Sequence, residues 1–170
     1  MELTDILPLE KWVVLEKDIT GRSGLDASVF NTDGIRITDF RQWANRLCPA
    51  IKATDKGQSF ICAVAHMNLA MQAMKTKKSV IEECDAGLMK LVVPIFADEA
   101  FVGAVGACGF LLDDGELDNF MINRTTEIDE EEIENLSEGI KTITTGDAEL
   151  LVAYIEGQIE SIVSDFKNQG

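Results

Sequence analysis

The chain has 170 residues, which is enough for one domain whose core needs no metal ion or disulfide to hold it together. Aspartates and glutamates number 30 against 15 lysines and arginines, and the net charge of −15 argues against binding to nucleic acid or an anionic membrane. No apolar run is long enough to span a membrane and the N-terminus lacks the features of a signal peptide, so we expect a cytoplasmic protein. The four cysteines are then expected to be reduced, without disulfides.

The first half of the chain predicts three helical segments and one short hairpin. Apolar residues recur at helical spacing in three segments, at residues 9–22, 40–53 and 55–75. The last of these is the clearest helix, whereas Pro49 makes the middle one either a helix or two short turns. Residues 25–31 and 35–38 flank an Asp-Gly turn, and this dipeptide between apolar runs is a strong hairpin signal.

A second, longer hairpin is the part around which the chain is organised. Two runs rich in β-branched and aromatic residues, 88–96 and 101–112, flank a polar break of hairpin length. Both faces of the second run are apolar or small, so we expect a covering layer on each side of it. Its glycines, Gly103, Gly106 and Gly109, are tolerated in a strand only where a helix, a bend or a ligand approaches closely.

One more strand is predicted before this hairpin, at residues 80–84, and helical segments follow it. These segments are a helical turn at 117–122, an acidic helix at 129–140, and a last helix from Thr145 or Asp147 to about Lys167. The last helix carries a narrow apolar stripe formed by Leu151, Ile155, Ile159, Ile162 and Phe166. Such a stripe needs a partner surface, either on the sheet of the same chain or on a second copy.

This order of elements predicts the α+β class, with a five-stranded antiparallel sheet and flanking helices in the manner of PAS and GAF sensor modules. The whole chain, 1–170, is expected to be a single domain. Its core should cover about residues 9–112, and residues 117–170 should form a helical C-terminal extension.

A metal site is one interpretation of the cysteines. Cys62 and His66 are four residues apart on the predicted helix 55–75, so they share a face, and Cys48 and Cys84 are plausible neighbours. Three thiolates and one imidazole suit zinc or another thiophilic metal such as iron. The alternative is that each free cysteine is a small buried apolar residue and that His66 is a hydrogen-bonded core residue.

A ligand cavity is expected between the helix 55–75 and the long hairpin, because small residues in a strand face a sulfur-rich helix there. The residues expected to line it are Cys62, His66, Cys84, Gly106 and Cys108. Asp85 and Lys90 flank the entrance of the hairpin. They either bind a small polar ligand or cap the strand and face water.

Catalysis has little support in the sequence. Cys62 and His66 resemble a thiolate–imidazole pair, but helix neighbours four apart rarely point at one substrate atom, and no third group orients them. No phosphate-binding loop, dinucleotide fingerprint or metalloprotease motif is present. We therefore expect a protein that is not an enzyme, and a thiol-dependent enzyme ranks last among the alternatives.

The long hairpin also carries a family resemblance. Cys84-Asp85-Ala86-Gly87-Leu88, a following strand with Pro94-Ile95, and the glycine-rich strand after it resemble the signature of the PocR sensory domain, over about residues 9–112. The resemblance implies a PAS-like module that senses a small hydrocarbon derivative or a related metabolite. The chain departs from the pattern at Asp85, where the family usually has histidine, and no output segment follows.

The combined interpretation is a stand-alone, cytoplasmic PocR-like sensor that signals through its terminal helices to a separate signalling protein. By the same resemblance we expect a homodimer, with a helix contact centred on Ile155, Ile159 and Ile162. The alternative is a metal or redox sensor in which Cys48, Cys62, His66 and Cys84 hold zinc, iron or another responsive centre.

Overall fold

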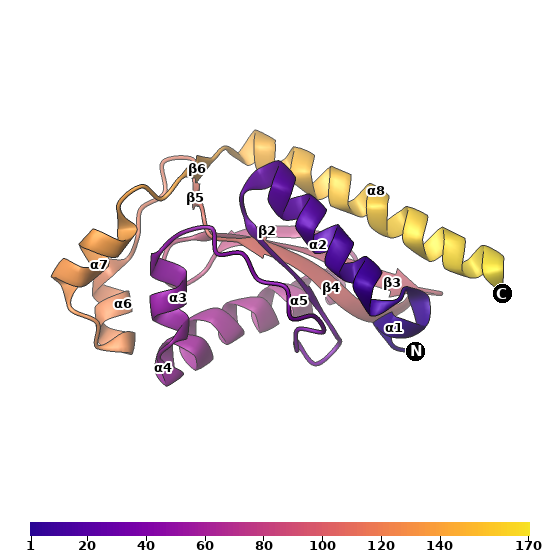
Figure 1. The fold of residues 1–170 in the computed structure, drawn as a ribbon, viewed down its shortest axis with the longest axis horizontal. Helices are drawn as coiled ribbons and strands as arrows, with labels where there is room; N and C mark the ends of the chain where they lie inside the picture. The colour runs from indigo at the N-terminus through magenta and orange to yellow at the C-terminus, as the bar shows by residue number, and fades with distance from the viewer.

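A four-stranded antiparallel sheet lies at the centre of the computed structural model, which describes residues 1–170 (Figure 1). Its strands, in spatial order, are β1 (Asp26–Phe30), β4 (Ala100–Cys108), β3 (Met89–Ala97) and β2 (Val80–Glu83). The predicted long hairpin is confirmed as β3 and β4, whose register places Lys90 opposite Cys108 and Val92 opposite Gly106. The α+β class is therefore confirmed.

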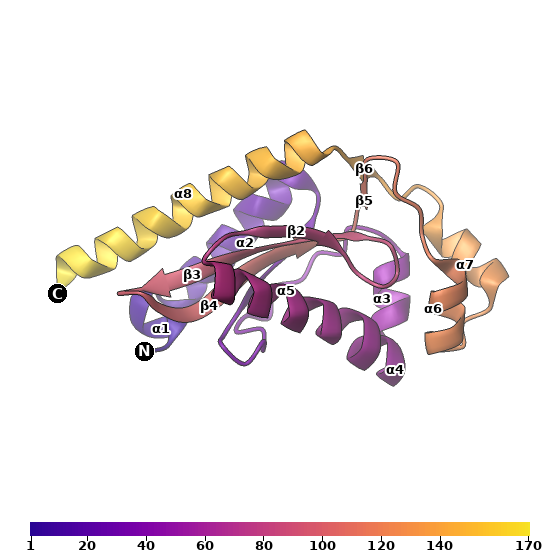
Figure 2. The same cartoon turned by 180° about the vertical axis from the view of Figure 1, so that it is seen from behind.

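Helices cover both faces of this sheet. On one face lie α1 (Leu3–Ile6), α2 (Leu9–Ser23) and α8 (Thr145–Gln169), and on the other lies α5 (Val64–Thr76) (Figures 1 and 2). Side chains alternate along a strand, so Leu91 packs toward α2 and α8, whereas its neighbour Val92 packs against Leu69 and Ala73 of α5. None of the helices combines the length and the apolar character needed to cross a membrane.

Several short elements surround this core. They are α3 (Leu47–Lys52), α4 (Asp55–Gly57), the π-helix η1 (Gln58–Ala63), β5 (Leu111–Leu112), α6 (Asn119–Thr126), α7 (Glu130–Ser137) and β6 (Thr142–Ile143). The predicted helix 55–75 is thus a continuous run of α4, η1 and α5 with a π-helical middle. The predicted strand 101–112 ends earlier, at Cys108, and β5 leaves the main sheet to pair in parallel with β6.

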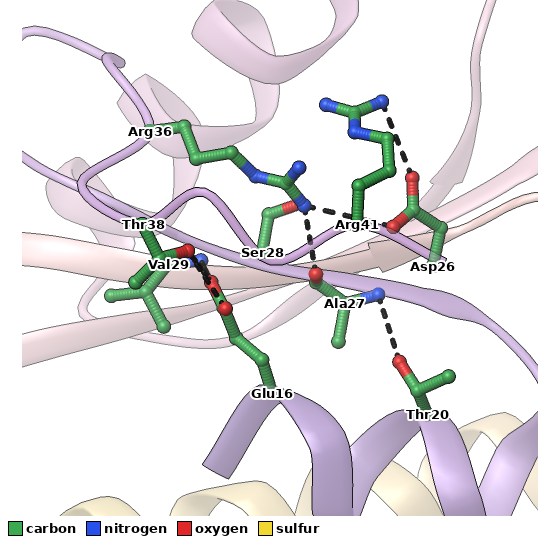
Figure 3. Close-up of polar contacts among 9 residues, drawn as sticks. All are labelled: Glu16, Thr20, Asp26, Ala27, Ser28, Val29, Arg36, Thr38 and Arg41. Carbon is green, nitrogen blue, oxygen red and sulfur yellow. Dashed lines mark hydrogen bonds and ion pairs between the residues drawn. The ribbon is translucent and has the colours of Figure 1, made fainter. Parts of the chain in front are cut away.

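The predicted fifth strand, residues 35–38, does not form. A single bridge between Phe30 and Arg36 is all that pairs this segment with β1. The reason is that side chains bind the outward-facing backbone groups of β1 (Figure 3). The N–H of Ala27 donates to the Thr20 hydroxyl, at 3.4 Å, and its carbonyl accepts from Arg36 Nη2, at 2.9 Å.

The next outward-facing residue of β1 is Val29, and its N–H donates to Oε1 of Glu16, at 2.8 Å. Only the Val29 carbonyl accepts from the neighbouring segment, from the N–H of Ile37 at 3.0 Å. Two residues of α2 therefore supply partners that a fifth strand would otherwise provide, and the sheet ends at β1.

The apolar stripe of α8 packs on its own chain. Ile155 is fully buried and Ile159 is 6% exposed, both within the core that contains Leu91 and Trp12. Ile162 is partly buried against the same core. The predicted dimer contact centred on these residues is therefore wrong, because the stripe already has its partner surface in the sheet and α2.

Candidate ligand-binding site

A small cavity of about 70 Å³ lies between the α5 side of the sheet and the segment formed by α3 and η1. Its polar and charged lining residues are Asp26, Ser28, Arg41, Lys52 and Lys90. Its sulfur-containing lining residues are Cys48, Cys62, Cys84 and Cys108. The remaining wall is mostly apolar and includes Phe30, Trp43, Ile61, Ala65 and Leu88.

A second depression is larger but carries less chemistry. It is an open groove of about 630 Å³ between α8 and β3, lined by residues such as Lys77, Pro94 and Glu156. Its walls bring no buried charged or nucleophilic groups together. The smaller cavity is therefore the better candidate for a binding site.

The strand register brings the charged wall of the cavity together. Cys108 of β4 is opposite Asp26 of β1 on one side and opposite Lys90 of β3 on the other. Because directly opposite residues in antiparallel strands point to the same face, the carboxylate, the thiol and the ammonium group all line one end of the cavity. Asp26 and Lys90 are both buried, so this is an unusually polar patch of a sheet interior.

The four thiols come from four separate segments. Cys48 lies on α3, Cys62 on η1, Cys84 follows β2, and Cys108 ends β4. All four are free, without a disulfide. Burial raises the pKa of Cys48, Cys62 and Cys84, so these groups are neutral thiols near pH 7 rather than reactive thiolates.

The loop between β1 and α3, which contributes Arg41, Trp43 and Ala44 to the wall, closes the cavity on its outer side. The guanidinium of Arg41 lies 4.2 Å from the centroid of the Trp43 ring. Asn45 fixes the end of the loop, because its Nδ2 donates to the carbonyl of Gly109 and its Oδ1 accepts from the N–H of Cys48, both at 2.7 Å. Gly109 has φ +116°, and a Cβ there would be only 2.5 Å from that of Ala44, so the loop packs against a position that requires glycine.

The charges of the site are unequally paired. Asp26 lies 3.6 Å from Arg36 and 3.5 Å from Arg41, so its carboxylate has two cationic partners. Neither Lys52 nor Lys90 has a carboxylate at ion-pair distance. Lys90 instead makes a cation–π contact, with Nζ 5.7 Å from the centroid of the Phe30 ring.

The antiparallel sheet with flanking helices, the cavity beside a glycine-rich strand and the Cys84–Leu88 turn agree with a comparison against known families. Residues 5–165 match the family described as the sensory domain found in PocR. The chain belongs to the PocR sensory domain family. No curated protein and no solved structure matches it.

The predicted ligand residues of this PocR domain divide into two groups. Cys62, Cys84, Lys90 and Cys108 line the cavity, whereas His66, Asp85 and Gly106 do not. Asp85 is exposed in the turn after β2. The ring of Phe30 covers Gly106, and a Cβ at that glycine would be 3.3 Å from the ring.

His66 of the PocR domain lies behind the cavity wall. Its ring stacks on Phe30 with a centroid distance of 3.6 Å, and neither ring nitrogen has a hydrogen-bond partner. Burial, helped by the nearby charges of Lys90 and Lys52, lowers the pKa of His66 to about 3, so the ring is neutral. The expected set of Cys48, Cys62, His66 and Cys84 is thus not assembled, and no three histidine, cysteine or acidic side chains are placed to hold a metal ion.

Sequence reasoning missed five lining residues of the cavity: Asp26 and Ser28 of β1, Arg41 and Trp43 of the closing loop, and Lys52 at the end of α3. A signal for the first two was present, because Asp26 and Ser28 alternate with apolar residues along a strand. In this PocR domain both faces of that strand are buried, so a polar face marks a site.

Proposed function

We propose that this PocR domain senses a small molecule bound in the cavity between the sheet, α3 and η1. The observation that carries the proposal is the convergence of two buried charged side chains, four partly buried thiols and aromatic rings on one cavity in a domain of a sensory family. The apolar wall formed by Phe30, Ile61 and Leu88 suits the hydrocarbon part of a ligand, in agreement with the small hydrocarbon derivatives expected from the family resemblance.

Arg36 lies between the cavity wall and Ala27 of β1, whose N–H donates to Thr20 of α2 (Figure 3). Its guanidinium contacts Asp26, which lines the cavity, and also donates to the Ser28 hydroxyl and the Ala27 carbonyl. The charge of Glu16 on α2 also acts on Arg36. A ligand that moves Asp26 or Arg36 therefore changes the environment of a buried carboxylate on α2.

Contacts between α2 and α8 would carry this change to the last helix. The Tyr154 hydroxyl of α8 donates to Asp18 of α2, and the guanidinium of Arg22 lies 4.1 Å from the centroid of the Tyr154 ring. Occupied and empty cavities would then favour different packings of the two helices, which is a population shift. The changed packing of the terminal helices would be the signal that a separate protein receives.

A ligand screen tests the proposal. Small metabolites are added to the purified chain and thermal stability is measured, with hydrogen exchange of α8 as a second readout. Ala65→Leu, which fills the cavity, should abolish the response, and Ala53→Leu at an exposed position should leave it unchanged. A compound that stabilises both variants equally would show that the cavity is not the binding site.

A thiol-based redox sensor is the second candidate, because four free cysteines surround one cavity. The raised thiol pKa values make oxidation slow, since the thiolate is the reactive form. Disulfide mapping by mass spectrometry after mild oxidant would show bonds among the four if this function is correct.

We also propose a homodimer, through the outer face of α5 instead of α8. Val64, Met67, Met71 and Met74 are exposed at spacings of three, four and three, which is the spacing of helices that pair through an apolar seam. Phe60 extends this surface from η1. The chain has no acidic residue from 56 to 81 despite its 30 acids, so two copies of this face meet without carboxylate repulsion.

A further inference from the structure

We infer that the cavity binds a short hydroxycarboxylate, with the carboxylate held by Lys52 and Lys90 and the hydroxyl by Asp26. The inference rests on the proposed sensing function and names the chemical class of its ligand. It depends on the charge, the unpaired polar atoms and the size of the cavity.

Charge is the first argument. The only carboxylate that lines the cavity is that of Asp26, and two arginines flank it at 3.5 and 3.6 Å. The next carboxylate, Glu16, is fully buried on the other side of β1 and accepts from Val29 and Thr38. Lys52 and Lys90 therefore leave an excess of positive charge in the cavity of a chain whose net charge is −15.

Burial makes this excess costly. Lys90 is only 9% exposed, and an ammonium group removed from water without an anionic partner is strongly unfavourable. The Phe30 ring, 5.7 Å from Nζ, compensates only in part. Burial also lowers the pKa of Lys52, with a further contribution from the charge of Arg41, as expected for a cation that lacks a counter-ion. An anionic ligand supplies the missing partner.

The thiols do not supply it. Burial keeps Cys48, Cys62 and Cys84 protonated, so they contribute weak S–H donors and no negative charge. Donors and cations therefore dominate the wall, which is the arrangement that binds an anion.

The Asp26 carboxylate also has one oxygen that accepts no hydrogen bond. Asp26 is 6% exposed, and its Oδ1 accepts no hydrogen bond, although Arg36 Nη2 lies 3.6 Å from it as an ion-pair partner. The ion pair leaves this oxygen without a hydrogen bond, and a ligand hydroxyl group in the cavity would donate one once the carboxylate turns toward it. A ligand with a hydroxyl near its carboxylate meets Asp26 and the lysines together.

Size limits the ligand to a few non-hydrogen atoms. The cavity of about 70 Å³ is roughly half the size of a protein cavity of about 150 Å³ that holds a benzene molecule. Nucleotides, sugar phosphates and aromatic acids are too large for this space. The smallest hydroxycarboxylate, glycolate, is of the right size and serves as the probe.

The test is an NMR titration of the ¹⁵N-labelled full chain with glycolate, acetate and glycolamide at constant ionic strength. Glycolate should shift the amides of Cys62, Lys90 and Cys108 and bind at least about tenfold more tightly than glycolamide, which lacks the charge. Acetate, which lacks the hydroxyl, should bind more weakly than glycolate. Lys90→Met and Lys52→Met should each weaken glycolate binding about tenfold or more, whereas Lys78→Met, an exposed control, should not.

Four outcomes of the titration would contradict the inference in whole or in part. Glycolamide binding as tightly as glycolate, unchanged binding in both cavity-lysine variants, or no response to any probe would overturn the inference. Equal binding of acetate and glycolate would overturn the role of Asp26. If Lys90→Met does not fold, Lys52→Met at its half-buried position decides the result. The proposed sensing function is decided separately, by the wider screen with Ala65→Leu, and survives if a neutral compound binds in the cavity.

Discussion

Replacing Glu16 by alanine should destabilise the fold by about 3 kcal/mol. The Val29 N–H loses its acceptor at 2.8 Å, and a buried N–H without a partner costs about 1–3 kcal/mol. The Thr38 hydroxyl loses a bond worth about 1 kcal/mol, and one buried methylene adds about 0.8 kcal/mol. Removal of a desolvated carboxylate offsets part of this loss.

Urea denaturation followed by tryptophan fluorescence measures the change, because Trp12 is fully buried and reports on the packing of α2. In a thermal scan the same loss lowers the melting temperature by about 6–12 °C. Glu10→Ala, at an exposed position of the same helix, should cost less than about 0.5 kcal/mol. A loss below about 1 kcal/mol for Glu16→Ala would refute the view that α2 completes the edge of β1.

Four further predictions follow from the same structure. Burial raises the pKa of Glu16 above its ordinary value of 4.5, so the folded chain keeps the carboxyl proton to a higher pH than the unfolded chain does. The free energy of unfolding therefore falls as the pH rises from 4.5 through the raised pKa, and Glu16→Gln should flatten that part of the curve of stability against pH. Gly109→Ala should cost about 2 kcal/mol in a denaturation experiment, whereas Gly157→Ala in an open part of α8 should be neutral or stabilising. Light scattering should find a dimer that Met71→Glu converts to a monomer and Gln72→Glu does not; a monomeric native chain at micromolar concentration would end the dimer proposal. Thiol titration of protein purified without reductant should find all four cysteines free after unfolding, and recovery of two would contradict the cytoplasmic interpretation.

Local sequence signals were sufficient for the long hairpin. Its two runs lie next to each other in the chain and are joined by a short turn. The register that the turn sets shifts by one residue at a bulge between Ile95 and Phe96, and this shift places Lys90 opposite Cys108. The prediction of a fifth strand was wrong because residues distant in the sequence prevent that strand from forming. No pattern within residues 25–38 shows that Glu16 and Thr20 bind the edge of β1.

The candidate site was predictable in its chemistry and less so in its geometry. The four cysteines do converge, but Cys62 and His66 do not act together. The expectation that they share a face assumes 3.6 residues per turn, whereas Cys62 lies in a π-helix with a wider turn. The amphipathic stripe of α8 showed that a partner surface was needed, and could not show that this surface was the chain's own sheet.

The side chains that end the sheet at β1 also protect the molecule from aggregation. An open edge strand offers free N–H and C=O groups to a strand of another molecule. Ala27 and Val29 offer none, because α2, Arg36 and Ile37 already bind those groups. The opposite edge, β2, is four residues long and ends in the exposed carboxylates Glu82 and Glu83, which repel an identical strand. A chain that is 46% hydrophobic thus leaves neither edge of its sheet open to strand-by-strand growth.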